Sequence, residues 1–345
     1  MFLDCSDLGS LKHQTDAEVK DAFRICKGAV DKYKTPLASI DVDNAARPMA
    51  SRVASRFKTQ CGQVVLVLRD PSHCVDLCSK DLALTNVVKH VLADCKVVRD
   101  FVKIDRIDSI RLEDVRDGCL EYDAKAVDMV STRMNLVHDY LLQTRKQYAF
   151  TQLVSENPKF QMYYKERTTA TKTKLDLTLE RCRQRDIWLK MDMLSSNLTC
   201  HFKQVHQLCS REDFPLSAYP ILVQGLRNDI NRGLTSEFDA VLGEGARAEI
   251  VGMVSERFNM DGLDPSGRKV GLLDRHHLMA FLCDPFGHEW RSIFKIQTNL
   301  AVLVREMIDL FVPLDDEGLS TSRKRILAKF MVSKFNFCIV RSTIH

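Results

Sequence analysis

Apolar residues recur at helical spacing along most of this chain, and two short segments near its start depart from that pattern. Residues 38–43 alternate between apolar and polar side chains, which predicts a short strand. Residues 64–68 are continuously apolar, as in a strand covered on both faces, so a second strand is predicted over 63–68. Helical patterns lie before, between and after these segments, which predicts an α/β layer whose two strands are adjacent and parallel.

Local signals place the ends of these first elements. Thr15 or Asp16 can cap the first helix, and the second helix can begin at Asn44 and end at Gly62. The turn at 70–72 starts a third helix, whose apolar side continues without a break as far as Val102.

After about residue 105 no further strand is predicted. The remaining helical segments are separated by Gly, Pro or Asn, and they span 123–155, 170–210, 218–230, 236–258, 272–283 and 294–312. Residues 318–345 contain no acidic side chain and accumulate Lys and Arg. We therefore expect an α/β unit over 1–105, a helical region over 106–317 and a basic tail over 318–345.

Composition narrows the class of protein. The 345 residues are 45% hydrophobic and 28% charged, and 14 Gly and 9 Pro are too few for a collagen-like or low-complexity chain. The net charge of +4 neither requires nor excludes a nucleic-acid partner. The start lacks the features of a signal peptide, and no apolar stretch approaches the ~18 residues of a membrane helix. We expect an intracellular protein, neither secreted nor held in a membrane.

The chain carries no familiar motif of a small-molecule enzyme: the nucleophile elbow, the Walker loop, the dinucleotide glycine motif and the zinc-protease motif do not occur. The twelve cysteines include no Cys-x-x-Cys pair and are expected as small buried residues. His73 could bind a metal with Cys74 or Cys78, but the spacing is not that of a zinc site. His277 and Cys283 fall on different faces of a helix, so we expect hydrogen-bonded core histidines and no complete metal site.

Four motifs, in order along the chain, resemble those of hAT-superfamily transposases. They are Ile-Asp-Val-Asp-Asn-Ala-Ala at 40–46, Asp-Pro-Ser-His-Cys-Val-Asp-Leu-Cys-Ser-Lys-Asp-Leu at 70–82, Ser-Thr-Arg-Met at 131–134 and His-His-Leu-Met-Ala-Phe-Leu-Cys-Asp-Pro at 276–285. The resemblance extends from about residue 3 to 290. Its most specific parts are 73–82 and 282–285.

This resemblance implies the second half of an RNase H-like core, followed by the family's helical insertion. Residues 2–5 look like the end of the core's third strand, which would pair with the predicted sheet. Family members use three carboxylates to hold two Mg²⁺ or Mn²⁺ ions, which activate the attacking oxygen and stabilise the leaving one. Asp43 matches the second carboxylate, although an Asp after a strand is also an ordinary helix cap. Asp70 and His73 match a further family motif. Arg133 matches a residue expected to contact the DNA backbone, although a surface salt bridge is the simpler alternative.

The departures from the family pattern predict an inactive protein. The strand with the first carboxylate, the motif with the third and the amino-terminal zinc module have no counterpart in the sequence, and Met134 stands where the family has Trp. We therefore expect a truncated transposase descendant without catalysis or a cofactor of its own. Residual binding of nucleic acid or protein is the expected function, and the chain can also form homo-oligomers.

Two alternatives to this function stay open. The chain could be an active DNA transposase or nuclease, completed by missing segments or by a partner, or it could be a helical scaffold for protein interactions. The tail residues Arg323, Lys324 and Arg325 are candidates for binding phosphates and for nuclear import, so the expected location is nuclear or cytoplasmic. The dispersed charges of 159–185 are interpreted as a solvated helix face.

Overall fold

The computed structural model describes residues 15–34, 37, 39–42, 46–117, 136–211, 214–258, 271–273, 277, 278 and 281. Of these residues 82% are helical, and a small parallel sheet accompanies the helices. The chain divides into two compact units. The first comprises Met1–Cys74, Leu208–Gln224 and Arg257–His345, and the second comprises Val75–Gln207 and Gly225–Glu256. The boundaries expected after residues 105 and 317 stay predictions.

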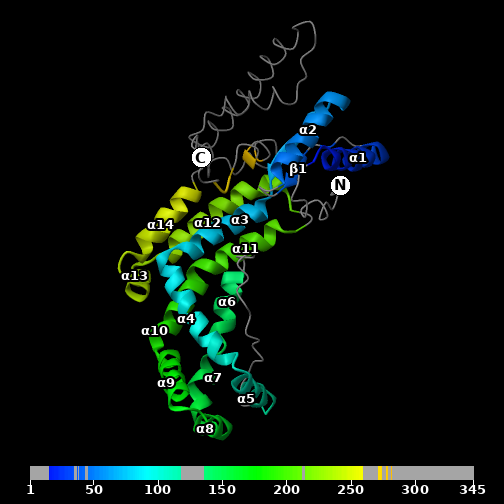
Figure 1. The fold of residues 1–345 in the computed structure, drawn as a ribbon. Coiled ribbons are helices and arrows are strands. Elements are labelled where there is room, and N and C mark those ends of the chain that lie inside the picture. Colours follow the sequence, from blue (N-terminus) through cyan, green and yellow to red (C-terminus); the bar gives the residue numbers. More distant parts are fainter. Residues whose placement is uncertain are drawn as a thin grey trace. The chain divides into compact units, whose positions relative to one another are not determined.

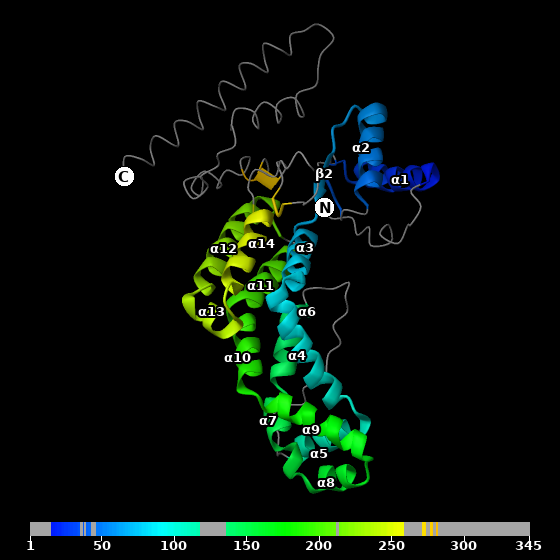
Figure 2. The same ribbon diagram turned by 60° about the vertical axis from the view of Figure 1, so that its left-hand side comes forward.

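The first unit begins with α1 (Asp16–Tyr33), β1 (Ser39–Val42), α2 (Arg47–Cys61) and β2 (Leu66–Arg69), which are labelled across Figures 1 and 2. Strands β1 and β2 pair in parallel, with Ser39 opposite Leu66 and Val42 opposite Arg69. The prediction of two adjacent parallel strands is confirmed, and in the described part of the chain these are the only strands. The pairing expected for residues 2–5 lies outside the described residues.

Capping residues fix the ends of the first two helices. Thr15 and Glu18 form a reciprocal capping box at the start of α1, which confirms the predicted cap. Gly62 ends α2 with φ of 64°, a left-handed conformation that glycine adopts without steric cost. Asn44, the cap expected for α2, lies outside the described residues.

Helices α1 and α2 share an apolar core with the sheet. The rings of Phe23 and Phe57 meet edge to face at 4.8 Å, and Phe57 is fully buried. Partly buried Ile40, from β1, packs against the same cluster, which comprises Val19, Ala22, Phe23, Cys26, Met49, Val53, Phe57 and Val65. This packing holds the sheet against the two helices.

The remaining helices of the described chain follow in order. They are α3 (Pro71–Leu84), α4 (Asn86–Val102), α5 (Asp105–Arg116), α6 (Leu136–Arg145), α7 (Tyr148–Leu153), α8 (Pro158–Lys165), α9 (Thr169–Arg183), α10 (Arg185–Leu194), α11 (Cys200–Cys209), α12 (Tyr219–Gly233), α13 (Ser236–Leu242) and α14 (Ala246–Arg257). Short 3₁₀ turns cover Val154–Glu156 and Leu216–Ala218, and a π-helical turn, Ser195–Thr199, joins α10 to α11.

The single helix expected from residue 71 to Val102 is wrong, because the chain breaks at Thr85 into α3 and α4. The Thr85 hydroxyl accepts a hydrogen bond from the Val88 N–H. The Glu249 carboxylate, from α14, accepts from the Asn86 and Val87 N–H groups at 2.7 and 3.2 Å. A negative charge at a helix amino terminus is favourable, so these contacts stabilise a new helix start that apolar spacing does not reveal.

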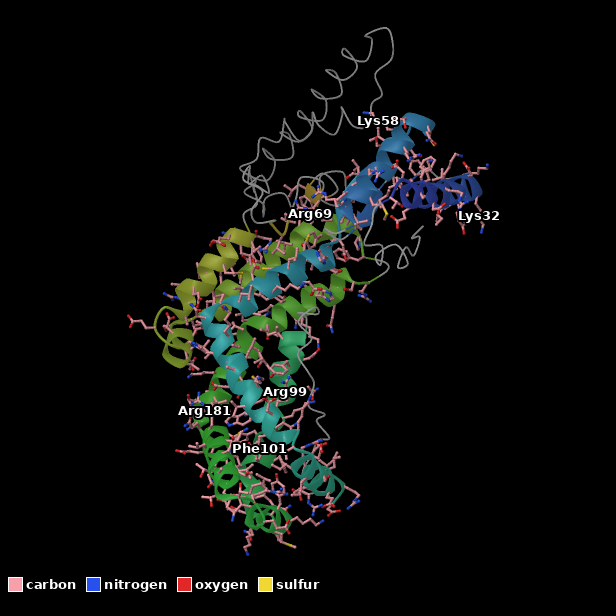
Figure 3. The ribbon with its side chains drawn as sticks, in the orientation of Figure 1. Lys32, Lys58, Arg69, Arg99, Phe101 and Arg181 are labelled. Atoms are coloured by element: carbon pink, nitrogen blue, oxygen red, sulfur yellow. The ribbon has the colours of Figure 1, made fainter. Side chains whose placement is uncertain are left out.

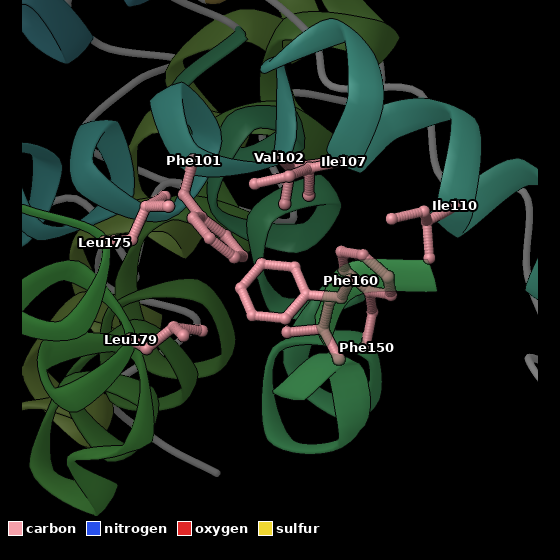
Figure 4. Packing of buried hydrophobic residues seen from close by; sticks show 9 residues of the cluster. Phe101, Val102, Ile107, Ile110, Phe150, Phe160, Leu175 and Leu179 are labelled. Atoms are coloured by element: carbon pink, nitrogen blue, oxygen red, sulfur yellow. The ribbon is translucent and has the colours of Figure 1, made fainter. Parts of the chain in front are cut away.

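A second apolar core joins α4, α5, α7, α8 and α9 (Figure 4). Phe101 and Phe160 meet edge to face with ring centres 6.5 Å apart. The cluster comprises Phe101, Val102, Ile107, Ile110, Phe150, Val154, Phe160, Leu175 and Leu179. The apolar faces of α8 and α9 are therefore buried in the core of the second unit.

Candidate functional site

The carboxyl ends of β1 and β2 are the edge at which open α/β sheets place functional groups. The Asp70 N–H donates to the Val42 carbonyl at 3.1 Å, so the residue after β2 lies beside the last residue of β1. Asp43 follows Val42 in the sequence but lies outside the described residues. This hydrogen bond places Asp70 next to Val42, the residue that directly precedes Asp43 in the sequence.

Asp70 caps α3. Its Oδ1 accepts from the Ser72 N–H at 2.8 Å, and both carboxylate oxygens lie 2.8 Å from the Ser72 hydroxyl. Pro71 takes the first helical position, where its missing N–H costs nothing. These contacts are typical of an aspartate helix cap.

The described residues at this edge do not fit a two-metal centre. Such a centre needs several carboxylates that face two cations, whereas the Asp70 carboxylate at this edge accepts hydrogen bonds from the Ser72 N–H and hydroxyl. Among the residues that the structure describes, no three His, Cys, Asp or Glu side chains gather closely enough to hold a metal ion.

His73 lies in the first turn of α3, as expected, but it is only partly buried where a largely buried side chain is predicted. Its neighbours Cys74 and Cys78 are buried. Burial, together with smaller contributions from the Asp70 carboxylate and Cys74, raises the pKa of the nearby Cys209 thiol to about 12. A thiol with this pKa stays protonated at neutral pH, so Cys209 is a poor nucleophile and a poor metal ligand.

A buried histidine from the fourth motif anchors the end of β2. His277 is fully buried, and its Nε2–H donates to the Arg69 carbonyl at 3.1 Å. Its ring meets the Tyr219 ring edge to face at 4.8 Å. The Tyr219 hydroxyl donates to the Leu272 carbonyl at 3.0 Å. The interpretation of His277 as a hydrogen-bonded core histidine is confirmed.

Arg69, labelled in Figure 3, strengthens the same junction because its Nη1 donates to the Gly271 carbonyl at 3.4 Å. In the first unit His277, from the fourth motif, therefore contacts the end of β2, directly before the second motif, although His277 and Arg69 are 208 residues apart in the sequence. Sequence reasoning missed this contact. No local pattern signals a partner so distant along the chain.

Several predicted site residues lie outside the described residues. These are Asp43, Arg133, Arg323, Lys324 and Arg325, together with the tail helix expected around them. Their roles stay predictions.

Comparison with known proteins assigns no family to the chain. No protein-family model, curated protein or solved structure matches it. Across the described residues, the helices are too short or too polar to cross a bilayer. The resemblance to transposases thus depends on the four sequence motifs alone.

Proposed function

We propose that this chain descends from an hAT-type transposase and binds nucleic acid without cleaving it. The observation that carries the proposal is the hydrogen bond from His277, in the fourth motif, to the carbonyl of Arg69, the residue directly before the second motif. Two segments inherited from one ancestral core would be expected to meet in this way, whereas chance matches to the family carry no such expectation.

The first unit supports the finer fold in this proposal. Its order of strand, helix, strand and helix, with both strands parallel, is the order expected in the second half of an RNase H-like core. The first motif spans the end of β1, and the second begins directly after β2. Asp43 would then take the place of the family's second metal-binding carboxylate.

The same edge supports the loss of catalysis. Metal-dependent strand cleavage needs a set of carboxylates around two ions. Asp70 is engaged as a helix cap, and its contacts with Ser72 leave it poorly suited to replace a missing ligand. What remains of the ancestral activity in this proposal is affinity for nucleic acid, with the nucleus as its location.

Binding of labelled duplex DNA to the full chain, followed by fluorescence anisotropy, tests this proposal. We expect salt-sensitive binding that persists in EDTA and therefore does not require Mg²⁺. Asp43→Ala should bind as the unchanged chain does, and so should the control Asp21→Ala, at an exposed residue of α1 that pairs with Arg24 in the described part of the chain.

Two results would contradict the proposal. Mg²⁺-dependent binding that is lost in Asp43→Ala but kept in Asp21→Ala would indicate a working metal site, which favours an active nuclease. An absence of DNA binding even at low salt would remove the nucleic-acid function, which leaves a helical interaction scaffold.

A further inference from the structure

The end of α8 and the start of α9 concentrate positive charge. Residues 158–174 contain five basic side chains and a single acid, Glu166. Lys159 is paired with Glu113 at 2.5 Å. The other four have no carboxylate partner among the described residues, and we name them the hairpin cations: Lys165, Arg167, Lys172 and Lys174.

Aromatic rings hold two of the hairpin cations in place. The Arg167 guanidinium lies over the Tyr163 ring at 4.2 Å, and the Lys172 ammonium lies over the Tyr164 ring at 5.6 Å. The Tyr164 hydroxyl donates to Asp176 at 2.7 Å, which fixes that ring against α9. Stacking of this kind keeps the charge and orders the side chain, so less conformational entropy is lost when an anion binds.

A groove lies between the same helices. Its volume is about 690 Å³, and Lys165 is part of its lining together with Ser155, Phe160, Gln161, Tyr164, Asp176, Leu179, Glu180 and Arg183. Phe160 and Leu179 are buried, whereas Lys165 and Arg183 are exposed. Exposed Asp176 and Glu180 balance these two cations in the lining, so the groove itself has no net charge, and Arg167, Lys172 and Lys174 are not part of its lining.

The apolar side of the hairpin is already occupied within the unit. Leu175, Leu179 and Phe160 belong to the core cluster of Figure 4, so insertion of α9 into a bilayer would require unpacking that core. The start of α9 instead carries the exposed Thr169, whose hydroxyl can donate to a phosphate oxygen, whereas the hydroxyls of Thr168 and Thr173 are hydrogen-bonded to Thr171 and to the Thr169 carbonyl.

We infer that the hairpin cations form a contact for the phosphate backbone of nucleic acid. This inference rests on the proposed function and locates its binding surface. Four cations spread over two helix ends suit a row of phosphates better than a single bound anion, and they provide affinity without base recognition. The interpretation of these charges as a solvated face did not consider the stack of Arg167 on Tyr163, four residues away, or that of Lys172 on Tyr164, which depends on how α8 and α9 pack.

The test compares two variants of the full chain, each of which loses three Lys and one Arg at different positions. The hairpin variant is K165Q/R167Q/K172Q/K174Q, and the matched control is K20Q/R24Q/K58Q/K89Q, whose residues are exposed on α1, α2 and α4. DNA affinity is measured over a salt series. Each lost phosphate contact should lower the log–log salt slope by about 0.9 and the affinity by about eightfold at roughly 0.1 M salt. The control should keep the affinity and slope of the unchanged chain, apart from a small uniform loss.

A third variant, K165R/K172R/K174R, separates charge from folding. It keeps every positive charge and should retain the affinity of the unchanged chain. Equal helical circular dichroism in all variants would show that the losses come from the surface.

Four other outcomes would overturn the inference, and each leads to a different conclusion. If the unchanged chain binds DNA and the hairpin variant binds equally well, the hairpin is not the contact although the proposed function stands. If nothing binds DNA, the proposed function fails as well. If polyglutamate displaces DNA as well as unlabelled DNA does, the surface recognises acidic polypeptides. Hairpin-dependent binding to phosphatidylserine vesicles, with no binding to DNA, would assign the surface to membranes.

Discussion

Gly233, the last residue of α12, lies against the backbone of the π-helical turn Ser195–Thr199, and an alanine at this position would test how closely the two segments pack. A Cβ built on Gly233 would lie 2.2 Å from the Asn197 carbonyl oxygen, whereas such contacts are essentially never shorter than 3.0 Å. The two backbones would have to separate by about 0.8 Å. Since neither atom is the end of a flexible side chain, we expect a cost of about 2 kcal/mol, typical of overpacking.

The same helix supplies the control. Gly225 has no atom within 4 Å of the Cβ position, and neither glycine has a positive φ. Gly225→Ala should therefore stabilise the protein by about 0.5–1 kcal/mol through helix propensity and a less flexible unfolded chain. The two substitutions make the same chemical change, but we expect opposite signs.

Thermal unfolding followed by circular dichroism measures both effects. For a unit of this size, Gly233→Ala should lower Tm by roughly 4–8 °C, and Gly225→Ala should raise it by roughly 1–4 °C. A Tm for Gly233→Ala at or above that of the unchanged chain would refute the close approach of α12 to the π-helical turn.

Three further predictions concern titration and capping. Asp70→Ala should destabilise the protein by about 1 kcal/mol, because the cap of α3 is lost, and Asp70→Asn should destabilise it by less. Urea unfolding measures both effects, and equal losses of stability would contradict the capping role. Burial, and next the charge of Lys203, lower the pKa of His138 below 6.5. The unfolded chain then binds that proton more readily, so stability should fall as pH drops below about 6.5, and His138→Gln should lessen this fall; an unchanged pH profile would contradict it. Burial raises the pKa of the Cys95 thiol to about 12, whereas Cys61 is exposed. Iodoacetamide at about pH 8 should therefore modify Cys61 well before Cys95, which mass spectrometry can measure. Equal rates of modification would contradict the burial of Cys95.

Local chemistry explains which parts of the fold were predictable. The parallel pair β1–β2 follows from two short strand patterns with a helix between them. The cap at Thr15 is equally local, because its partner Glu18 is only three residues further along the chain. Gly62 likewise ends its helix by its own conformational freedom. Signals of this kind involve neighbours in the sequence, so pattern and propensity identify them.

Contacts between distant residues explain the rest. The break at Thr85 depends partly on Glu249, which lies more than 160 residues away, and continuous apolar spacing hides it. The anchoring of β2 by His277 has the same origin. For the candidate surface, Lys172 was visible in the sequence, but its position over the Tyr164 ring depends on how α8 and α9 pack.

Incubation of the full chain with end-labelled duplex DNA and Mn²⁺, resolved on native and on denaturing gels, tests the central claim most directly. The claim predicts a retarded complex on the native gel and full-length strands on the denaturing gel. Shortened strands, or the absence of any retarded complex at low salt, would contradict it.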